Sequence, residues 1–374
     1  MIAIRPVPNI YYLMAKGSSL ADLHRDNGAH FGQEDGWSLP LHFGESLLEY
    51  QAVRSCVGLF DLCHRSLLQF TGPDRVAYLP GMVSNNVEIL SPGQGTHAAV
   101  LDIHGKIQAD IRILCMQNHL LIDLWEALKE KVVNHLNRYL IADEVEINDL
   151  TDRYGIVSVQ GPKSDHLLEG LLKTNKLPSM ELSHDEFTDA NARFRVVYAS
   201  HTGEKGYDLI IEKKDLLPLM LSIQKTGKAH SIRWVGCQAQ EMLRVEAGIP
   251  RYGTDMSEDN LLLETGLDNA VSFQKGCYLG QEVVERINSR GHVNRKLVGL
   301  TLEGDQAARQ GDAIYGGQSQ IGEVTSSIFS PILKCPLALG YVQREHIEQG
   351  TQAMIHSNGK RIPAVVSRLP FYKP

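Results

Sequence analysis

The chain has 374 residues, of which 43% are hydrophobic and 22% are charged, enough for roughly two or three domains with a large buried core. Its 37 basic and 44 acidic residues give a net charge of -7. There is no basic surplus of the kind that binds nucleic acid, so nucleic acid is not an expected partner. No apolar stretch is long enough to cross a bilayer, so no membrane association is expected.

The first 250 residues alternate between strand and helix patterns. The helices show apolar residues at helical spacing, and the strands are short apolar or alternating runs between turn residues. In chain order we predict irregular polar structure over 1–30, a helix over 46–57, strands over 96–100, 106–114 and 119–124, a helix over 125–139, strands over 193–200 and 206–212, and helices over 215–225 and 235–247.

Two further stretches, residues 66–79 and 156–168, resemble each other. Each reads as a strand, a Gly-Pro turn and a helix with an acid near its start, which suits the unpaired N–H groups and the dipole at that end. The turns, at Gly72 and Gly161, lie 89 residues apart (161 minus 72). Either two ordinary strand–turn–helix units or an internal duplication of an α+β unit explains this pattern.

From residue 295 onward the pattern changes to short strands separated by glycine-rich turns. Such spacing favours a small β-barrel or sandwich. The predicted strands cover residues 297–302, 312–315, 320–326, 338–342, 352–355 and 361–366.

The cysteines show no metal-binding or disulfide pattern. They occur at positions 56, 63, 115, 237, 277 and 335. Without a C-x-x-C pair or zinc spacing we expect no metal, and the thiols should be free in a reducing cytoplasm. Residues 1–8 contain two prolines and no long apolar stretch, so we predict that they are not a signal peptide.

The segment K-G-C-Y-L-G-Q-E at residues 275–282 concentrates unusual chemistry. Cys277 lies between Gly276 and Gly280, and the charge of Lys275 would favour the reactive thiolate. A buried structural cysteine at a loop–helix junction is the alternative interpretation, since free cysteine is among the most buried residue types. The run resembles the K-G-C-[FY]-x-G-Q-E signature of the YgfZ family, folate-binding proteins linked to the maintenance of iron–sulfur enzymes.

Other motifs, in their shared order, resemble the wider superfamily that contains YgfZ and the glycine cleavage T-protein, an aminomethyltransferase. The matching segments are G-W with P-L-H-F-G at 36–44, A-V-R at 52–54, G-L-F-D at 58–61, T-G-E-K-G-Y at 202–207, L-R-V-E-A-G at 243–248, Y-G-T-D-M at 252–256, and G-E-V-T-S-S, S-P and A-L-G-Y-V within 322–342. The resemblance implies an α+β fold: two related, ferredoxin-like α+β units and a C-terminal β-barrel, arranged as a three-lobed ring around a central folate cavity. The folate-binding region would cover 25–290, with its units near 66–150 and 155–250, and the barrel would cover 295–370.

The resemblance implies tetrahydrofolate, or a one-carbon derivative, as the bound small molecule. Glu204, in the T-G-E loop, is our candidate to accept both N–H groups of the pteridine edge, although a surface loop acid is the alternative. Tyr207 and Tyr252 are candidates for the wall of the flat ring or for core residues. Lys275 and Arg244 are also candidate folate contacts, and Arg244 could instead pair with Glu246.

The densest basic cluster of the chain precedes the barrel. Its members are Arg286, Arg290, His292, Arg295 and Lys296. It could bind the anionic glutamate tail of a folate and attract the ligand electrostatically, or it could be a solvated linker with salt bridges.

The aminomethyltransferase reaction needs an acid near the reactive folate nitrogen, which the resemblance places in an adjacent acidic pair. Here only Asp110 of that pair is present, and Ala109 replaces the other acid. On a strand these two residues point to opposite faces. If the site lies on the Ala109 face, its acid is lost and Asp110 is a partner of Arg112. The T-protein's F-D-x-S-H-M is also altered, to F-D-L-C-H-R at 60–65.

These departures favour a YgfZ-like function over glycine catabolism. We expect a cytoplasmic tetrahydrofolate-binding protein that supports iron–sulfur cluster assembly or repair, with Cys277 as its functional thiol and iron–sulfur client or assembly proteins as partners. One alternative is a folate-dependent aminomethyl- or methyltransferase, or a demethylase, that uses Asp110. A second is an adaptor with a vestigial folate cavity.

Overall fold

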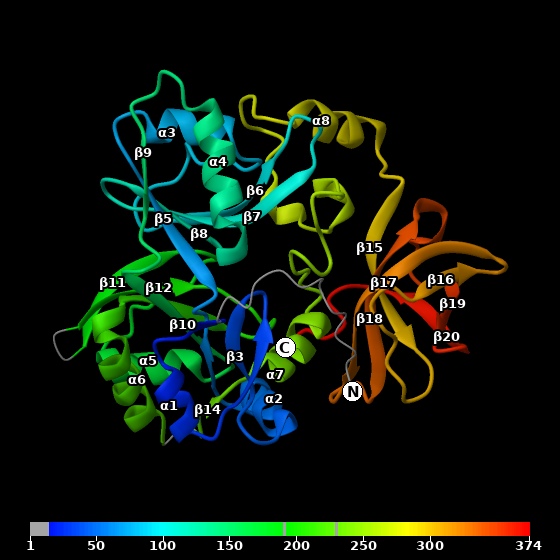
Figure 1. Ribbon diagram of the computed structural model, residues 1–374, viewed down its shortest axis with the longest axis horizontal. Helices are drawn as coiled ribbons and strands as arrows, with labels where there is room; N and C mark the ends of the chain where they lie inside the picture. Colours follow the sequence, from blue (N-terminus) through cyan, green and yellow to red (C-terminus); the bar gives the residue numbers. More distant parts are fainter. Residues whose placement is uncertain (1–14, 190–191, 229–230) are drawn as a thin grey trace.

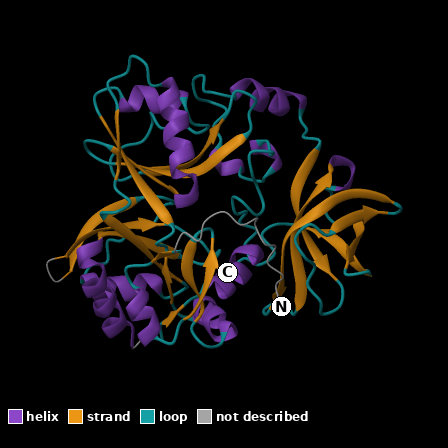
Figure 2. Ribbon diagram, in the orientation of Figure 1, coloured by secondary structure: helices purple, strands orange, loops and turns teal. Residues whose placement is uncertain are grey.

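The computed structural model of the protein describes residues 15–189, 192–228 and 231–374. Residues 1–8, predicted not to be a signal peptide, lie outside this part. The elements form three lobes, two α+β units and a β-barrel (Figure 1, Figure 2). No described helix is long and apolar enough to cross a membrane.

The first α+β unit is a five-stranded antiparallel sheet in the order β6-β7-β8-β5-β9. Its elements are β5 (Arg65–Thr71), α3 (Arg75–Tyr78), β6 (Gly95–Leu101), β7 (Ile107–Cys115), β8 (Leu120–Trp125), α4 (Lys129–Tyr139) and β9 (Glu146–Asp149). Every second residue at the start of β7 is apolar and buried, so one face of the sheet packs under the helices, against Val132 and Leu136 of α4.

The second α+β unit is a six-stranded sheet in the order β11-β12-β13-β10-β4-β14. Its elements are β4 (Gly58–Asp61), β10 (Tyr154–Gln160), α5 (Ser164–Leu172), β11 (His184–Asp189), β12 (Ala192–Tyr198), β13 (Gly206–Glu212), α6 (Lys213–Gly227) and β14 (Arg233–Trp234). Apolar residues of β13, among them Leu209 and Ile211, pack against α5 and α6.

The two units share one topology. In chain order, β5–α3–β6–β7–β8–α4–β9 corresponds to β10–α5–β11–β12–β13–α6–β14. The strand orders also correspond, except that β4 is inserted between β10 and β14. This correspondence confirms the predicted pair of α+β units and supports the interpretation as a duplication.

The C-terminal lobe is a closed six-stranded barrel in the order β15-β18-β17-β16-β19-β20. Its strands are β15 (Arg295–Leu302), β16 (Ala313–Gly316), β17 (Ser319–Ser330), β18 (Cys335–Gln343), β19 (Gln352–Ser357) and β20 (Lys360–Ser367). Closure leaves no unpaired sheet edge. Each of the six strands predicted from the sequence is present, so the barrel interpretation is confirmed.

The N-terminal region is more regular than predicted. The expectation of irregular structure over residues 1–30 is wrong where the chain is described, because β1 (Lys16–Gly17), α1 (Ala21–Asp26) and the start of β2 (His30–Glu34) lie there. Together with β3 (Trp37–His42), the strands make a three-stranded sheet in the order β1-β3-β2. Polar residues and single glycines hid these short strands from a periodicity analysis.

Three helices connect the lobes. They are α2 (Ser46–Ser55), α7 (Cys237–Glu246) and α8 (Gln281–Arg290). Helix α7 contacts α2 and also strands β17 and β18 of the barrel. Gly248 follows the end of α7 in the left-handed conformation, with φ +66°. The end of α7 is therefore the point where the second unit, the barrel and α2 meet.

Candidate functional site

The burial pattern of strand β7 shows which face of the first sheet can present reactive side chains. Ala109 is fully buried in the core between the sheet and its helices, with Ile107 and Ile111 beside it in the alternation. Asp110 and Arg112 point to the opposite face. The hypothesis that the site lies on the Ala109 face is therefore wrong, and an alanine there removes no acid from a ligand-accessible surface.

The Asp110 face of the first sheet lies against the second sheet. Apolar side chains of both sheets form a shared core between them, including Leu114 and Leu121 from the first and Val197 and Ile210 from the second. At the edge of this core the strands bring charged side chains together from β5, β7, β8 and β13. The interface of the two units is therefore the candidate site.

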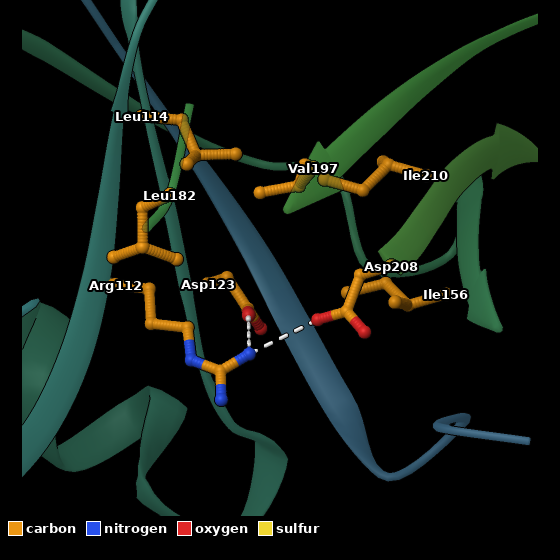
Figure 3. Close-up of a pocket in the computed structure, with 8 residues that line it drawn as sticks. All are labelled: Arg112, Leu114, Asp123, Ile156, Leu182, Val197, Asp208 and Ile210. Atoms are coloured by element: carbon orange, nitrogen blue, oxygen red, sulfur yellow. Dashed lines mark hydrogen bonds and ion pairs between the residues drawn. The ribbon is translucent and has the colours of Figure 1, made fainter. Parts of the chain in front are cut away.

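The centre of the candidate site is Arg112. Its guanidinium lies 3.0 Å from a carboxylate oxygen of Asp208 and 4.0 Å from one of Asp123 (Figure 3). Asp123 also accepts a hydrogen bond of 2.6 Å from Nε of Arg65. The carboxylates of Asp123 and Asp208 are only 6% and 4% exposed, so both are buried charges that the arginines neutralise.

His201 completes this network from the loop before β13. Its ring nitrogen Nε2 lies 2.9 Å from Asp208. The backbone N–H of His201 donates to the side-chain oxygen of Gln160, 3.0 Å away, and Thr202 donates to the same oxygen. Burial lowers the pKa of His201, so the ring is neutral near pH 7. The T-G-E loop thus positions His201 against the charged cluster.

Asp208 is held ionised by its partners. Burial acts to raise the pKa of its carboxyl, but His201 and Arg112 outweigh burial and lower the pKa to about 2. Since His201 is neutral near pH 7, we assign most of the charge stabilisation there to Arg112. Asp208 is the main site residue that was not predicted from the sequence. An acid within the otherwise apolar strand segment 206–211 is unusual and could have indicated it.

Asp110 is the more accessible carboxylate of the site. Its side chain is 28% exposed, and one of its carboxylate oxygens lies 3.6 Å from Nε2 of His97, on β6. Burial raises the pKa of Asp110, but His97, Arg65 and Arg112 together lower it below its ordinary value. Asp110 is therefore ionised near neutral pH, and its contact with His97, at 3.6 Å, is longer than the 3.0 Å contact that Asp208 makes with Arg112.

A small cavity lies beside Arg112, between the two sheets. Its walls combine Asp123 and Asp208 with apolar side chains such as Leu114, Leu182 and Val197 (Figure 3). Its volume is about 10 Å³, which is close to the space that one water molecule needs. A pterin ring does not fit this cavity, so the cavity is no ring-binding pocket.

Glu204 lies away from this network. Its carboxylate is 3% exposed and pairs with Nη1 of Arg54, on α2, at 2.9 Å. Arg54 also pairs with Glu246, at the end of α7, and its guanidinium lies over the ring of Tyr372. The predicted role of Glu204 as the pteridine acceptor is not supported by this position, because the carboxylate already serves an ion-pair network between α2, α7 and the C-terminal tail.

Two other residues that were predicted to contact the folate, Tyr207 and Arg244, have structural positions instead. Tyr207 is 3% exposed and lies in the core under α5 and α6, on the face of β13 opposite Asp208. Arg244 pairs with Glu241 and, at 2.7 Å, with Asp255, and it donates to Ser326 of the barrel. Its predicted partner Glu246 is bound by Arg54 instead. Neither side chain is free to contact a folate.

Tyr252 lies closer to the site. It is half-buried, and its hydroxyl lies 3.3 Å from the backbone oxygen of Ile107 and from Nζ of Lys131. Burial raises the pKa of this hydroxyl, and the negative charge of Asp110 contributes in the same direction. Tyr252 therefore remains a candidate contact for a ligand that binds near Asp110.

Cys277 is exposed, so the alternative of a buried structural cysteine is wrong. Lys275 is bound elsewhere: its ammonium donates to the backbone oxygens of Pro80 and Val83, both 2.6 Å away. Burial lowers the pKa of Lys275 to about 8. Gly280 begins α8 with φ +80°, and a side chain there would clash with the backbone of Asp102. The segment is therefore docked firmly on the first unit, with its thiol facing outward.

The predicted basic cluster is spread out. Arg286 is exposed on α8, and Arg290 ends that helix. Arg295 pairs with Glu264 and lies over the ring of Tyr341. Arg295 therefore belongs to the junction with the barrel, whereas Arg286 keeps a position from which it could attract an anion.

Two facing α+β sheets with a charged cluster between them, followed by a closed barrel, define the architecture of a glycine cleavage T-protein. Residues 20–275 match the GCVT N-terminal domain, and residues 295–373 match the glycine cleavage T-protein C-terminal barrel domain. The chain belongs to the glycine cleavage T-protein family.

Similar proteins support this assignment along the whole chain. An aminomethyltransferase from Halalkalibacterium halodurans is 30% identical over 96% of this chain and 98% of its own length. One from Streptomyces coelicolor is 31% identical over 95% and 97%. The crystal structure of the glycine cleavage system aminomethyltransferase T from Bartonella henselae superimposes with a TM-score of 0.88 at 26% identity, covering 96% of this chain and 98% of that one.

Proposed function

We propose that the protein is a tetrahydrofolate-dependent one-carbon transferase of the aminomethyltransferase type, acting in the cytoplasm. The observation that carries this proposal is the position of Asp110. It lies on the face of the first sheet that meets the second sheet, as a partly exposed, ionised carboxylate. The family and the relatives named aminomethyltransferase support the same reading. This proposal replaces the YgfZ-like function as our first choice, because the argument from Ala109 no longer stands.

Asp110 is the carboxylate of the site that can meet the reactive nitrogen of a reduced pterin. A carboxylate can accept a charge-assisted hydrogen bond from an N–H group of such a ring. The carboxylate of Asp110 is 28% exposed, and its contact with His97 is 3.6 Å long, while the oxygens of Asp208 are buried and engaged by Arg112 and His201. We therefore assign the ligand-facing role to Asp110 and the orienting role to Asp208.

Tetrahydrofolate, when bound, supplies the nucleophilic nitrogen that takes up the one-carbon group. Asp110 is placed to stabilise positive charge that develops at that nitrogen and to accept a proton from it. His97 most strongly, and Arg65 and Arg112 to a smaller extent, lower the pKa of Asp110, and Asp123 and Asp208 fix Arg112 in place. Tyr252 and Arg286 remain candidates for contacts with the ring and with the anionic tail.

The test has two parts. Calorimetry with tetrahydrofolate should show saturable binding, and the protein should form methylene- or methyl-tetrahydrofolate from a member of a panel of aminomethyl, methylamine and methyl donors. Binding without turnover of any donor would remove the transferase proposal. No binding at all would favour an adaptor with a vestigial cavity.

The exposure of Cys277 supports a second candidate, support of iron–sulfur enzymes through contact with client or assembly proteins. One cysteine cannot hold a cluster alone, so any cluster would be shared with a partner for a short time. Replacing Cys277 with alanine should then lower aconitase-type activity in cells while folding and folate binding persist. Unchanged activity of such enzymes in that variant would remove this candidate.

A further inference from the structure

His97 lies on the same face of the first sheet as Asp110. It pairs with Arg112 across β6 and β7, and directly opposite residues of an antiparallel pair point to the same face. Asp110 precedes Arg112 by two residues on β7, so its side chain lies diagonal to His97 on that face. Nε2 of the imidazole is 3.6 Å from a carboxylate oxygen of Asp110. The function proposed above gives this imidazole no part in moving a proton.

The position of His97 is fixed and partly open to solvent. β6 is an edge strand of the first sheet, so His97 lies on the outer side of Asp110. The side-chain amide of Asn85 donates to the backbone oxygen of His97, 2.8 Å away, and to that of Asn269. The side chain of His97 is 19% exposed. The imidazole therefore stands between the carboxylate of Asp110 and the water at the sheet edge.

Other polar neighbours of Asp110 are poor proton acceptors. Arg65 and Arg112 pair with buried carboxylates, and a guanidinium does not lose its proton in proteins. Burial raises the pKa of the Tyr252 hydroxyl, so that group keeps its proton near neutral pH. An imidazole, in contrast, can take up and release a proton near neutral pH. Among these neighbours, His97 is therefore the group that can take a proton from Asp110.

Charged groups of both units face His97. Asp110 and Arg112 face it from β7. Glu181, in the segment before β11 of the second unit, interacts electrostatically with His97 and with Arg112. The guanidinium of Arg112 is itself held by Asp208, at 3.0 Å. A proton that reaches the imidazole therefore meets two carboxylates, which stabilise its charge, and one guanidinium that a third carboxylate largely offsets.

We propose that His97 is a positioning residue for the transfer, which orients the carboxylate of Asp110 and takes over the proton that Asp110 accepts. The inference rests on the proposed function, because it assigns the next step of the same proton. The 3.6 Å contact has to shorten for this step, as contacts between catalytic groups often do when a ligand binds.

The proton and the electrons balance without a further reactant. The one-carbon unit forms a bond to the folate nitrogen while its bond to the donor breaks, and the electron pair of the broken bond stays with the donor atom. Asp110 accepts the proton that the folate nitrogen loses. His97 takes this proton at Nε2 and passes it to water, so that Asp110 is a carboxylate again before the next transfer.

The test is the steady-state kinetics of folate-dependent transfer by full-length His97→Ala. We expect kcat to fall roughly 10²-fold, the lower end of what a positioned proton acceptor contributes, while calorimetry gives an essentially unchanged affinity for tetrahydrofolate. Added imidazole should restore the rate in a saturable way, because free imidazole can enter the vacated space and accept the proton. Loss of packing or of a ligand contact would not respond to imidazole.

His97→Gln is the second variant, should His97→Ala fail to fold. Its amide can still donate to Asp110 but cannot take over a proton. We expect a similar loss of kcat with unchanged folate affinity, and no recovery with imidazole, because the amide fills the space. His104→Ala is the matched control, since His104 is an exposed histidine in the turn that joins β6 to β7. It should keep the wild-type kcat with and without imidazole.

The outcomes separate this role from the proposed function. Wild-type kcat in the His97 variants would overturn the role of His97 alone. A loss that appears only as weaker folate binding, or a loss in folded His97→Ala that imidazole does not restore, would overturn it as well. A wild-type protein that transfers no one-carbon group from any donor would remove the proposed function, and the role of His97 with it.

Discussion

The two α+β units share one topology, apart from the inserted β4, but their acidic residues lie in opposite environments. In the second unit, Asp208 is 4% exposed and is bound by Arg112 and His201. In the first unit, Asp110 is 28% exposed, with His97 3.6 Å away. One carboxylate is locked into the protein and the other is available to a ligand.

Two units with the same topology can therefore have different roles: the buried Asp208 stabilises the structure, whereas the more exposed Asp110 can take part in chemistry. Arg112, next but one to Asp110 on β7, reaches across to neutralise Asp208. The same guanidinium adds to the effects of His97 and Arg65, which lower the pKa of Asp110. The buried ion pair between the two units thus contributes to keeping the more exposed acid of the first unit ionised.

The largest expected loss of stability follows from restoring an acid at the core position of β7. Ala109→Asp would bury an unpaired carboxylate in the core of the first unit, where Ala109 is fully buried. We expect a cost on the order of 3–5 kcal/mol, or failure to fold. Denaturant unfolding measures this cost.

Gln108→Asp is the matched control, because it adds the same charge on the half-exposed opposite face of β7. It should change the free energy of unfolding by less than about 1 kcal/mol. A stable Ala109→Asp variant with increased transferase activity would contradict our assignment of the two faces.

Asp208→Asn should lower the free energy of unfolding by roughly 3 kcal/mol. This is the lower part of the range for breaking a buried ion pair, because Arg112 keeps a second carboxylate, that of Asp123, at 4.0 Å. The pKa of Asp208 is about 2 in the folded state, against an ordinary value of 3.8. A carboxyl with a depressed folded pKa stabilises the fold above its unfolded pKa, and this stabilisation is lost as the pH falls from about 4 to 2.

Between about pH 4 and pH 2 the free energy of unfolding of the wild type should fall by about 2 kcal/mol more than that of Asp208→Asn. The shift in the pKa of Asp208, from 3.8 to about 2, corresponds to about this free energy. Urea unfolding as a function of pH compares the two proteins. Parallel pH curves would show that Asp208 is not held ionised by its neighbours.

Glu204→Gln tests the ion-pair network between α2 and α7. The amide keeps a hydrogen-bond acceptor for Arg54, which also retains Glu246, so we expect a loss of about 1–2 kcal/mol. Since Glu204 lies apart from the Asp110 site, calorimetry should give an affinity for tetrahydrofolate that is essentially unchanged. Loss of folate binding with unchanged stability would restore the original hypothesis that Glu204 grips the pteridine.

The smallest effect is expected for Cys277→Ala. The side chain is exposed, so the free energy of unfolding should change by no more than about 0.5 kcal/mol. Cys115→Ala, a buried cysteine 8% exposed, is the control and should cost more. A large destabilisation by Cys277→Ala would assign the thiol a packing role.

Much of the fold could be predicted because its periodic patterns are long. The six barrel strands and the strand–turn–helix starts at 66 and 156 came directly from alternation and turn residues. Helix α8 and the short strands β1, β2 and β3 could not be predicted, since polar sequences of that length carry too weak a pattern.

The site was harder to predict than the fold. Alternation on β7 correctly separated Ala109 from Asp110, and the apolar Ile107 and Ile111 already marked the Ala109 face as core. The ion pair of Glu204 could not be predicted, because a motif gives no information on the distant Arg54 that binds it. Asp208 was missed because its partners come from another sheet, and contacts between distant segments leave no local pattern.

The central claim is that the accessible carboxylate of the first unit carries out the chemistry. Steady-state kinetics of folate-dependent transfer with Asp110→Asn tests it most directly, alongside calorimetry with tetrahydrofolate. We predict that kcat falls by roughly 10²–10⁴, the usual contribution of a positioned acid or base, while the affinity for tetrahydrofolate changes only a few-fold and the fold remains intact. A variant that retains the wild-type kcat would contradict this account.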